Sequence, residues 1–155
     1  MRLEIRNVVK KFGNLAAVDD CSLQLDKDGI FGLVGPNGSG KTTLFNVISG
    51  FLKPDRGRII YGSKPIGGKG PIGITRLGIA RTFQLPRVFS NLTVQENLEA
   101  SMFDGGHKIQ ELMEVFNLRE VRNSLASAIS FGQKKQLEHR CLQIFLDRKI
   151  GKYSW

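Results

Sequence analysis

Eight consecutive residues have the types and spacing of a phosphate-binding loop. Residues 35–42 read Gly-Pro-Asn-Gly-Ser-Gly-Lys-Thr and match the pattern GxxxxGK[ST] at every fixed position. The glycines let backbone N–H groups converge on phosphate oxygens, and the start of a following helix adds partial positive charge. Lys41 supplies a point charge for the β- and γ-phosphates, and the Thr42 hydroxyl is a ligand for Mg²⁺. The loop therefore predicts the binding of a nucleoside triphosphate.

Such a loop needs a buried strand before it and a helix after it. Residues 29–34 form an apolar run without alternation, as expected for a strand that is buried on both faces. Apolar residues then recur at helical spacing until about Gly50. This stripe consists of Leu44, Val47, Ile48 and Phe51. The strand–loop–helix context favours a phosphate site over the alternative, a purely structural glycine-rich turn.

The remaining elements follow from periodicity. Strands are predicted at 3–9, 17–25, 58–62 and 79–83, and helices at 92–102, 109–116 and 130–145. Thr93 is a plausible N-cap for the first of these helices. The glycine-rich stretch 67–70 lacks a clear helix start behind it, so we expect a connection there and no second phosphate site.

Composition sets further bounds on the class of protein. With 155 residues, 41% hydrophobic and 24% charged, the chain is typical of one globular domain. No apolar run approaches the roughly 20 residues of a membrane-spanning helix, and no signal peptide is evident. Cys21 and Cys141 are expected to be small buried hydrophobes. The net charge of +9 is scattered, which favours a solvated basic surface over a nucleic-acid interface.

Several stretches together resemble one family. The stretch GPNGSGKTTLFNVISG at 35–50 resembles the Walker A region of ABC-transporter ATPases. The stretch GIARTFQ at 78–84 resembles the family's Q-loop segment, and VFSNLTVQENL follows it. Residues 129–133, Ile-Ser-Phe-Gly-Gln, resemble the signature LSGGQ with two substitutions. Over roughly residues 1–140 the chain looks most like the ATPases of branched-chain amino acid importers, with urea importers as the near alternative.

The resemblance implies a fold and a set of site residues. It implies an α/β P-loop NTPase of the ABC type with an N-terminal antiparallel region, a partial parallel sheet and a helical subdomain. The single incomplete domain would divide into a core at 1–91, a helical subdomain at 92–129 and a signature helix with a divergent tail at 130–155. The family's ligands are ATP and Mg²⁺. The resemblance implies that Phe12 stacks on adenine, that Thr42 and Gln84 coordinate Mg²⁺, and that Ser130, Gly132 and Gln133 contact the ATP of a partner subunit. The residues it implies for the phosphates are Gly35, Asn37, Gly38, Ser39, Gly40, Lys41, Thr42 and Thr43.

The family pattern is lost after the signature. The family continues with an apolar strand ending in Asp-Glu and, later, a switch histidine. Residues 144–147, Ile-Phe-Leu-Asp, resemble that strand, but they come too early, and Arg148 stands where a glutamate is needed as a general base. Neither His107 nor His139 has the place of the switch histidine. We therefore expect the C-terminal half of the core to be missing, by truncation or frameshift, with negligible hydrolysis and an unpaired, aggregation-prone edge at 30–34.

Three functions remain open at this stage. The resemblance implies an ATP-binding subunit, or a fragment of one, for an importer of branched-chain amino acids or a similar solute. Its partners would be transmembrane permease subunits and a second ATP-binding subunit in a head-to-tail dimer, at the cytoplasmic face of the membrane. The alternatives are a soluble ABC ATPase without a transport role and a truncated protein that binds nucleotide without hydrolysing it. No nucleic-acid partner is expected.

Overall fold

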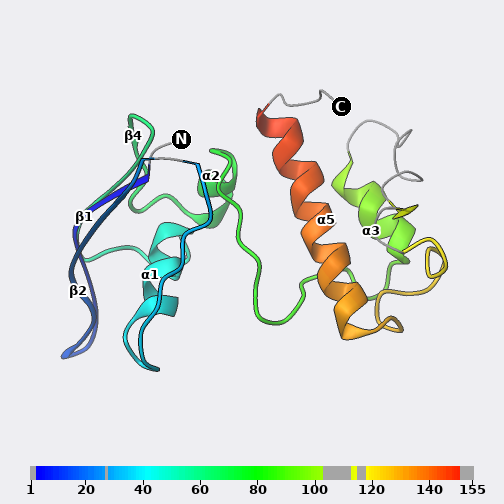
Figure 1. The fold of residues 1–155 in the computed structure, drawn as a ribbon, viewed down its shortest axis with the longest axis horizontal. Coiled ribbons are helices and arrows are strands. Elements are labelled where there is room, and N and C mark those ends of the chain that lie inside the picture. The colour runs from blue at the N-terminus through cyan, green and yellow to red at the C-terminus, as the bar shows by residue number, and fades with distance from the viewer. Residues whose placement is uncertain (1–2, 27, 103–112, 115–117, 151–155) are drawn as a thin grey trace. The chain divides into compact units, whose positions relative to one another are not determined.

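The computed structural model describes residues 3–26, 28–102, 113–114 and 118–150, and within the last helix it leaves out the side chains of residues 145 and 147–150 (Figure 1). The chain divides into two compact units, residues 1–79 and residues 80–155. Each unit has an apolar core of its own. The finer division at residues 91 and 129 stays a prediction.

The first unit is built on an antiparallel sheet with the strand order β2-β1-β3-β4. The bounds are β1 Leu3–Phe12, β2 Leu15–Leu25, β3 Arg56–Tyr61 and β4 Lys64–Pro65. A tight turn at Gly13, with a φ of 58°, joins β1 to β2, so that Phe12 pairs with Leu15. The predicted strands at 3–9, 17–25 and 58–62 are confirmed, and the first two are longer than predicted.

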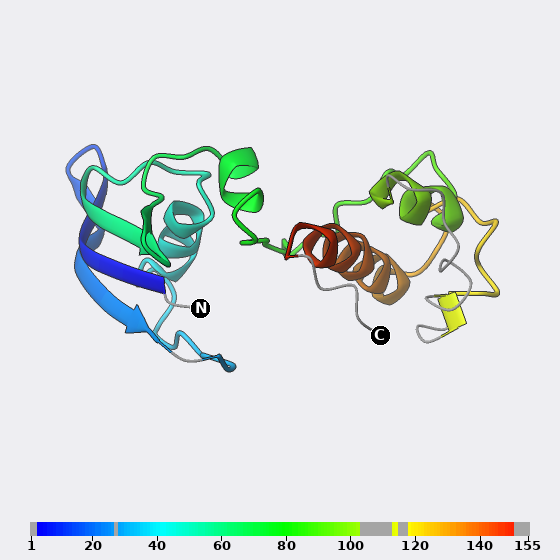
Figure 2. The same ribbon diagram turned by 90° about the horizontal axis from the view of Figure 1, so that it is seen from above.

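Helix α1, Lys41–Ile48, covers one face of this sheet in both views (Figures 1 and 2). Its buried Leu44 and Val47 pack against apolar side chains of the strands. The core of the unit consists of Ile5, Val8, Val18, Leu44, Val47, Ile59, Ile66 and Ile74. The predicted amphipathic helix after the phosphate loop is therefore confirmed, and it ends at Ile48, before Phe51.

A short helix follows the second glycine-rich stretch, where none was predicted. Helix α2, Pro71–Thr75, begins directly after Gly70, with proline at its first position. Proline is favoured there because its fixed φ suits the helix and its missing N–H has no helical partner at that position. Buried Ile74 anchors this helix in the core of the first unit. The helix has only five residues, so it does not provide a phosphate site of the kind at 35–43.

Residues 29–34 do not form the predicted parallel strand. They run as an irregular segment between β2 and α1 (Figure 1). Ile30 is 104% exposed and Val34 is 93% exposed. A strand with two apolar faces needs neighbouring strands at its edges and layers on both sides, and the described residues supply neither to it. The predicted strand at 79–83 is wrong as well, because these residues are irregular.

The second unit contains α3, Val94–Ser101, and α5, Phe131–Ile150, which pack side by side (Figure 1). Its core consists of Val94, Leu98, Met113, Leu118, Ala126, Ile129, Leu137 and Ile144. Helix α5 passes the predicted end at residue 145, and buried Ile144 lies on it. The stretch 144–147 is therefore helical and does not form an apolar strand. The predicted helix at 109–116 lies largely outside the described residues.

The predicted N-cap Thr93 starts α3, and the structure shows that Glu96 completes a capping box with it. The Thr93 hydroxyl accepts a hydrogen bond from the Glu96 backbone N–H at 3.2 Å, and the Glu96 carboxylate accepts one from the Thr93 N–H at 2.7 Å. The bond from the Thr93 N–H, and a second one that the Thr93 hydroxyl donates to the same carboxylate, hold the pKa of the Glu96 carboxyl below its usual range, because they favour its ionised form. The reciprocal bonds satisfy two donors that a helix start otherwise leaves unpaired.

Asn97 connects α3 to the loop before it. Its side chain is buried, and its Oδ1 accepts from the Phe89 backbone N–H at 2.8 Å. Its Nδ2 donates to the carbonyl oxygens of Phe89, Leu92 and Thr93 at 3.0, 3.3 and 2.9 Å. The thiol of Cys141 on α5 donates to the Asn97 carbonyl oxygen at 3.4 Å. Asn97 therefore fixes the loop to α3 through hydrogen bonds at both its amide oxygen and its amide nitrogen.

Three further features of the described residues concern membrane helices, metal clusters and thiols. In the part of the chain that the structure describes, no helix is long and apolar enough to cross a membrane. No cluster of three or more His, Cys, Asp or Glu side chains able to hold a metal ion occurs among those residues. Cys21 and Cys141 are unpaired thiols, each half-buried beside one of the two cores. Burial raises the pKa of the Cys141 thiol, which makes that group less reactive.

Candidate nucleotide site

The phosphate loop closes around the ammonium group of Lys41. This ammonium donates to the carbonyl oxygens of Gly35 and Pro36 at 2.7 and 2.6 Å, and it lies 3.3 Å from the Ser39 hydroxyl. Three donors on a single ammonium group therefore reach three oxygens of its own loop. The loop brings a positive charge and the N-terminus of α1 to the same place, which is the arrangement that attracts phosphate oxygens.

Glycine is required where the loop enters α1. Gly40 has a φ of 83°, and a Cβ at this position would lie 2.0 Å from the Ala17 carbonyl oxygen on β2. Gly38 also has a φ of 83°, but a side chain there would meet open space. The loop end is therefore packed directly on β2. Because a strand rises by about 3.4 Å per residue, Ala17 lies about 7 Å along β2 from Leu15, the partner of Phe12.

Phe12 lies at the last position of β1, with 49% of its surface exposed. The ammonium of Lys10 lies over its ring, 5.8 Å from the centroid, within the range of a cation–π contact. The Asp55 carboxylate accepts from the Lys11 backbone N–H at 2.7 Å and from the Lys10 ammonium at 2.9 Å. Both bonds hold the pKa of the Asp55 carboxyl below its usual range, and the bond from the Lys11 backbone N–H has the larger effect. This carboxyl is therefore ionised at neutral pH.

In the second unit, Gln84 lies exposed in a bend. The backbone on both sides of it is tied to α5. Before it, the Phe83 carbonyl oxygen accepts from the Lys135 ammonium. After it, the Arg87 N–H donates to the Glu138 carboxylate at 3.0 Å, and Glu138 also pairs with Lys135 at 3.2 Å. Gln84 is thus presented by a short segment with two fixed ends.

Two arginines reinforce this segment. The guanidinium groups of Arg81 and Arg87 lie 5.2 and 4.1 Å from the centroid of the Phe83 ring. Such contacts contribute about 0.5–1 kcal/mol each at exposed sites. They limit the freedom of the residues that flank Gln84.

The signature residues form the start of α5. The Ser130 hydroxyl accepts from the Gln133 N–H at 3.3 Å, and the Gln133 side-chain oxygen accepts from the Ser130 N–H at 2.9 Å. Ser130 thus caps the start of α5, and Gln133 completes a reciprocal capping box. At Gly132 a Cβ would meet no atom within 4 Å, so the described fold does not need glycine there. Phe131, beside it, is 58% exposed.

Replacing Glu138 with alanine is expected to loosen the Gln84 segment. The change removes the acceptor of the Arg87 N–H and the partner of Lys135 from a buried position, which costs about 1–3 kcal/mol. The amide of Arg87 should then exchange with solvent faster, as measured by hydrogen exchange. Glu138→Gln keeps one acceptor and should have a smaller effect. Exposed Glu120→Ala is the control, and unchanged exchange at Arg87 in Glu138→Ala would contradict the assignment.

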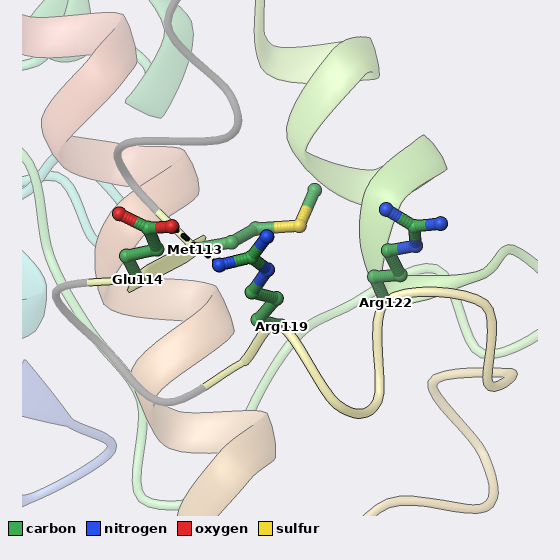
Figure 3. Close-up of a pocket in the computed structure, with 4 residues that line it drawn as sticks. All are labelled: Met113, Glu114, Arg119 and Arg122. Atoms are coloured by element: carbon green, nitrogen blue, oxygen red, sulfur yellow. Dashed lines mark hydrogen bonds and ion pairs between the residues drawn. The ribbon is translucent and has the colours of Figure 1, made fainter.

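A small pocket in the second unit is not suited to a nucleotide. It has a volume of about 80 Å³ and is lined by Met113, Glu114, Arg119 and Arg122 (Figure 3). Glu114 and Arg119 form an ion pair across it at 2.6 Å. Ligand pockets usually have volumes of about 300–1,000 Å³. This pocket is also lined by none of the site residues predicted from the sequence.

The predicted site residues thus fall into two groups. Phe12 and residues 35–43 belong to the first unit, and Gln84, Ser130, Gly132 and Gln133 belong to the second. The structure adds Asp55 and Glu138, whose bonds hold these groups in place. Sequence reasoning missed both because a carboxylate within a loop or a helix gives no local signal of a bond to a distant backbone N–H.

The family model described as ABC transporter matches residues 18–142, most of the chain. The chain belongs to the ABC transporter family. Solved structures agree with this assignment. An ATP-binding cassette of an ABC transporter in its ADP conformation matches with a TM-score of 0.78 at 33% identity, over 94% of this chain and 65% of that one. A nucleotide-free cassette matches equally well, with 34% identity over 94% and 66% of the two chains. The predicted ABC-type P-loop fold is confirmed.

Within the ABC transporter family, the chain is similar to proteins named for branched-chain amino acid transport. A probable branched-chain amino acid transport ATP-binding protein, LivG of Methanocaldococcus jannaschii, is 35% identical over 156 aligned positions, covering 88% of this chain and 61% of that protein. The high-affinity LivG protein of Salmonella typhimurium is 34% identical, covering 90% and 64%. The chain therefore spans less than two thirds of the length of these relatives.

Proposed function

We propose that the chain binds ATP with Mg²⁺ as part of the ATP-binding component of an ABC transporter. The observation that carries this proposal is the Lys41 ammonium, held inside a glycine loop at the N-terminus of α1. Phosphate oxygens are stronger acceptors than the carbonyl oxygens that now hold it. The loop residues Gly35, Asn37, Gly38, Ser39, Gly40, Lys41, Thr42 and Thr43 would hold the phosphates.

The stacking role of Phe12 is proposed from its exposed ring and the resemblance, and the Mg²⁺ ligands are proposed from the resemblance alone. Phe12 would stack on adenine through its exposed ring, with Asp55 and Lys10 holding the strand end. The hydroxyl of Thr42 and the amide oxygen of Gln84 would coordinate Mg²⁺. Both are oxygen ligands, which Mg²⁺ prefers.

The start of α5 would act on a nucleotide held by a second ATP-binding subunit. Gly132 supports this role, because glycine weakens a helix and no atom of the described fold requires it there. A glycine at an exposed helix start allows another molecule to approach the backbone closely. Ser130 and Gln133 lie beside it and would contribute hydrogen bonds.

The transport role is proposed from the relatives. Their names assign them to branched-chain amino acid transport, and we extend this to import of such amino acids or a similar small solute. Permease subunits in the membrane would be partners, with the chain at the cytoplasmic face. A soluble ABC ATPase without a permease is the second candidate, and the lack of a long insertion between Gln84 and Ser130 speaks against a repair protein.

ATP hydrolysis by this chain alone is expected to be negligible while ATP binding persists. The stretch 144–147 is helical, so it does not supply the strand-borne Asp-Glu pair that polarises the attacking water in the family. Calorimetric titration with ATP, with and without Mg²⁺, measures binding, and phosphate release measures turnover. Binding without turnover supports the proposal. Turnover above background contradicts the hydrolysis part, and absence of binding to either ATP or ADP contradicts the whole proposal.

A further inference from the structure

We propose that Asp55 is a positioning residue for the adenine half of the site. The inference is that its carboxylate holds the end of β1, and with it the ring of Phe12, in place for the base. It rests on the proposed ATP binding. The phosphate half of the site is positioned by other contacts, so the two halves are separable.

Asp55 contacts three consecutive residues of β1 just before Phe12. Its backbone N–H donates to the Val9 carbonyl oxygen at 2.9 Å. Its two carboxylate oxygens accept from the Lys10 ammonium at 2.9 Å and from the Lys11 N–H at 2.7 Å. These bonds join segments that lie 44 to 46 positions apart in the sequence. Asp55 therefore acts as a clamp on residues 9–11.

On the β3 side, the clamp replaces sheet pairing that stops short of Phe12, while Phe12 still pairs with Leu15 of β2 on the other side. The last register pair between β1 and β3 is Val9 with Arg56, so β1 continues beyond its neighbour on that side. On the other side, the pairing with β2 shifts register between Val8 and Lys10 and again between Lys10 and Lys11. A strand end that pairs on one side only is held weakly. The Asp55 carboxylate accepts a hydrogen bond from the Lys11 N–H, in place of the bond that a neighbouring strand would provide.

The same carboxylate also orders the cation beside the ring. The Lys10 side chain is only 15% exposed, and its ammonium lies 5.8 Å from the centroid of Phe12. The pair with Asp55 fixes this ammonium, which in turn restricts the ring. Half of Phe12 remains exposed, which leaves ring surface for a base. Lysine and aspartate together therefore hold the ring without covering it.

The phosphate loop depends on different contacts. Its end is packed on Ala17 of β2, and its lysine is held by loop oxygens. The bonds that make up the Asp55 clamp all go to residues 9–11, which lie outside the loop at 35–43. A loss of the clamp should therefore weaken binding of the base and leave binding of the phosphates unchanged.

The test compares ATP with inorganic tripolyphosphate, each with Mg²⁺, on the full chain. Asp55→Asn is expected to weaken ATP binding by about fivefold or more and to leave tripolyphosphate binding unchanged. Phe12→Ala, which removes the stacking ring, should weaken ATP binding by about 5- to 100-fold. The double variant should bind ATP no more weakly than Phe12→Ala alone, because Asp55 acts through the ring. Asp55→Glu keeps a carboxylate and should retain more ATP affinity than Asp55→Asn.

Asp20→Asn is the matched control. The Asp20 carboxylate accepts from the Asn7 side chain of β1 at 2.9 Å, so it is also an aspartate bonded to this strand, but away from Phe12. It should leave both affinities unchanged. An equal loss of ATP and tripolyphosphate affinity in Asp55→Asn overturns the proposal, since that result means general damage to the fold. Additive effects of Phe12→Ala and Asp55→Asn, or no effect of Asp55→Asn, also overturn it.

A second measurement keeps the inference testable without any nucleotide. Ring mobility of specifically labelled Phe12 can be followed by NMR in the free protein. Asp55→Asn should increase this mobility and Asp20→Asn should not. If the unaltered chain binds neither ATP nor tripolyphosphate, the proposed function fails, and the ring signals alone decide on Asp55. Unchanged ring signals in Asp55→Asn overturn the positioning role.

Discussion

Replacing Lys41 with alanine is expected to weaken binding of both ATP and inorganic tripolyphosphate by about 10- to 100-fold. A hydrogen bond to a charged group contributes about 1.5–3 kcal/mol, and about 1.4 kcal/mol corresponds to a factor of ten. The loss should be common to both ligands because the ammonium lies among loop oxygens at the start of α1, away from the proposed base contact. Calorimetric titration measures both affinities.

Lys69→Ala provides the control for Lys41. Lys69 also belongs to a glycine-rich stretch that is followed by a helix, but that helix has only five residues. Its removal should leave both affinities unchanged. Retention of full affinity in Lys41→Ala would contradict the phosphate site, and a comparable loss in Lys69→Ala would show that the effect comes from total charge.

Replacing Asn97 with alanine is expected to destabilise the second unit by about 3 kcal/mol. The change leaves the Phe89 N–H without its acceptor and removes the donor of three carbonyl oxygens. A buried polar group left unsatisfied costs about 1–3 kcal/mol, and the space of the lost amide adds to this. Urea unfolding followed by circular dichroism, together with hydrogen exchange of the α3 amides, measures the loss.

Exposed Asn123→Ala is the control for Asn97 and should change the free energy of unfolding by less than about 0.5 kcal/mol. A loss below about 1 kcal/mol in Asn97→Ala would mean that the loop holds its place without the amide. The two asparagines differ in burial and bonding, so the comparison separates the hydrogen-bond network from the residue type.

The sequence was most informative where a local pattern determines the local structure. The phosphate loop, α1 and the Thr93 cap were all predictable, because glycines, helical spacing and a capping residue act within a few positions. The hairpin of β1 and β2 was predictable from alternation and its Gly13 turn. Of the candidate site, the residue types and the loop geometry could therefore be foreseen.

The predictions that were wrong or missing share one physical cause. In each case the local structure depends on residues that are distant in the sequence. The run 29–34 has the composition of a buried strand, but a strand forms only where partners complete its hydrogen bonds. Conversely, α2 forms from a weak local pattern because Ile74 is buried in the core. Asp55 and Glu138 matter through bonds to backbone groups 44 and 51 positions away, which no local pattern encodes.

The exposed segment 30–34 also affects how unfolding should be interpreted. The heat-capacity change of unfolding arises mainly from apolar surface that becomes newly hydrated. Ile30 and Val34 are already almost fully in contact with water in the folded chain, and Phe31 is half exposed. These side chains therefore add little to that change, although they count fully in the 41% hydrophobic content. The heat-capacity change of unfolding of this chain should therefore be smaller than its hydrophobic content implies.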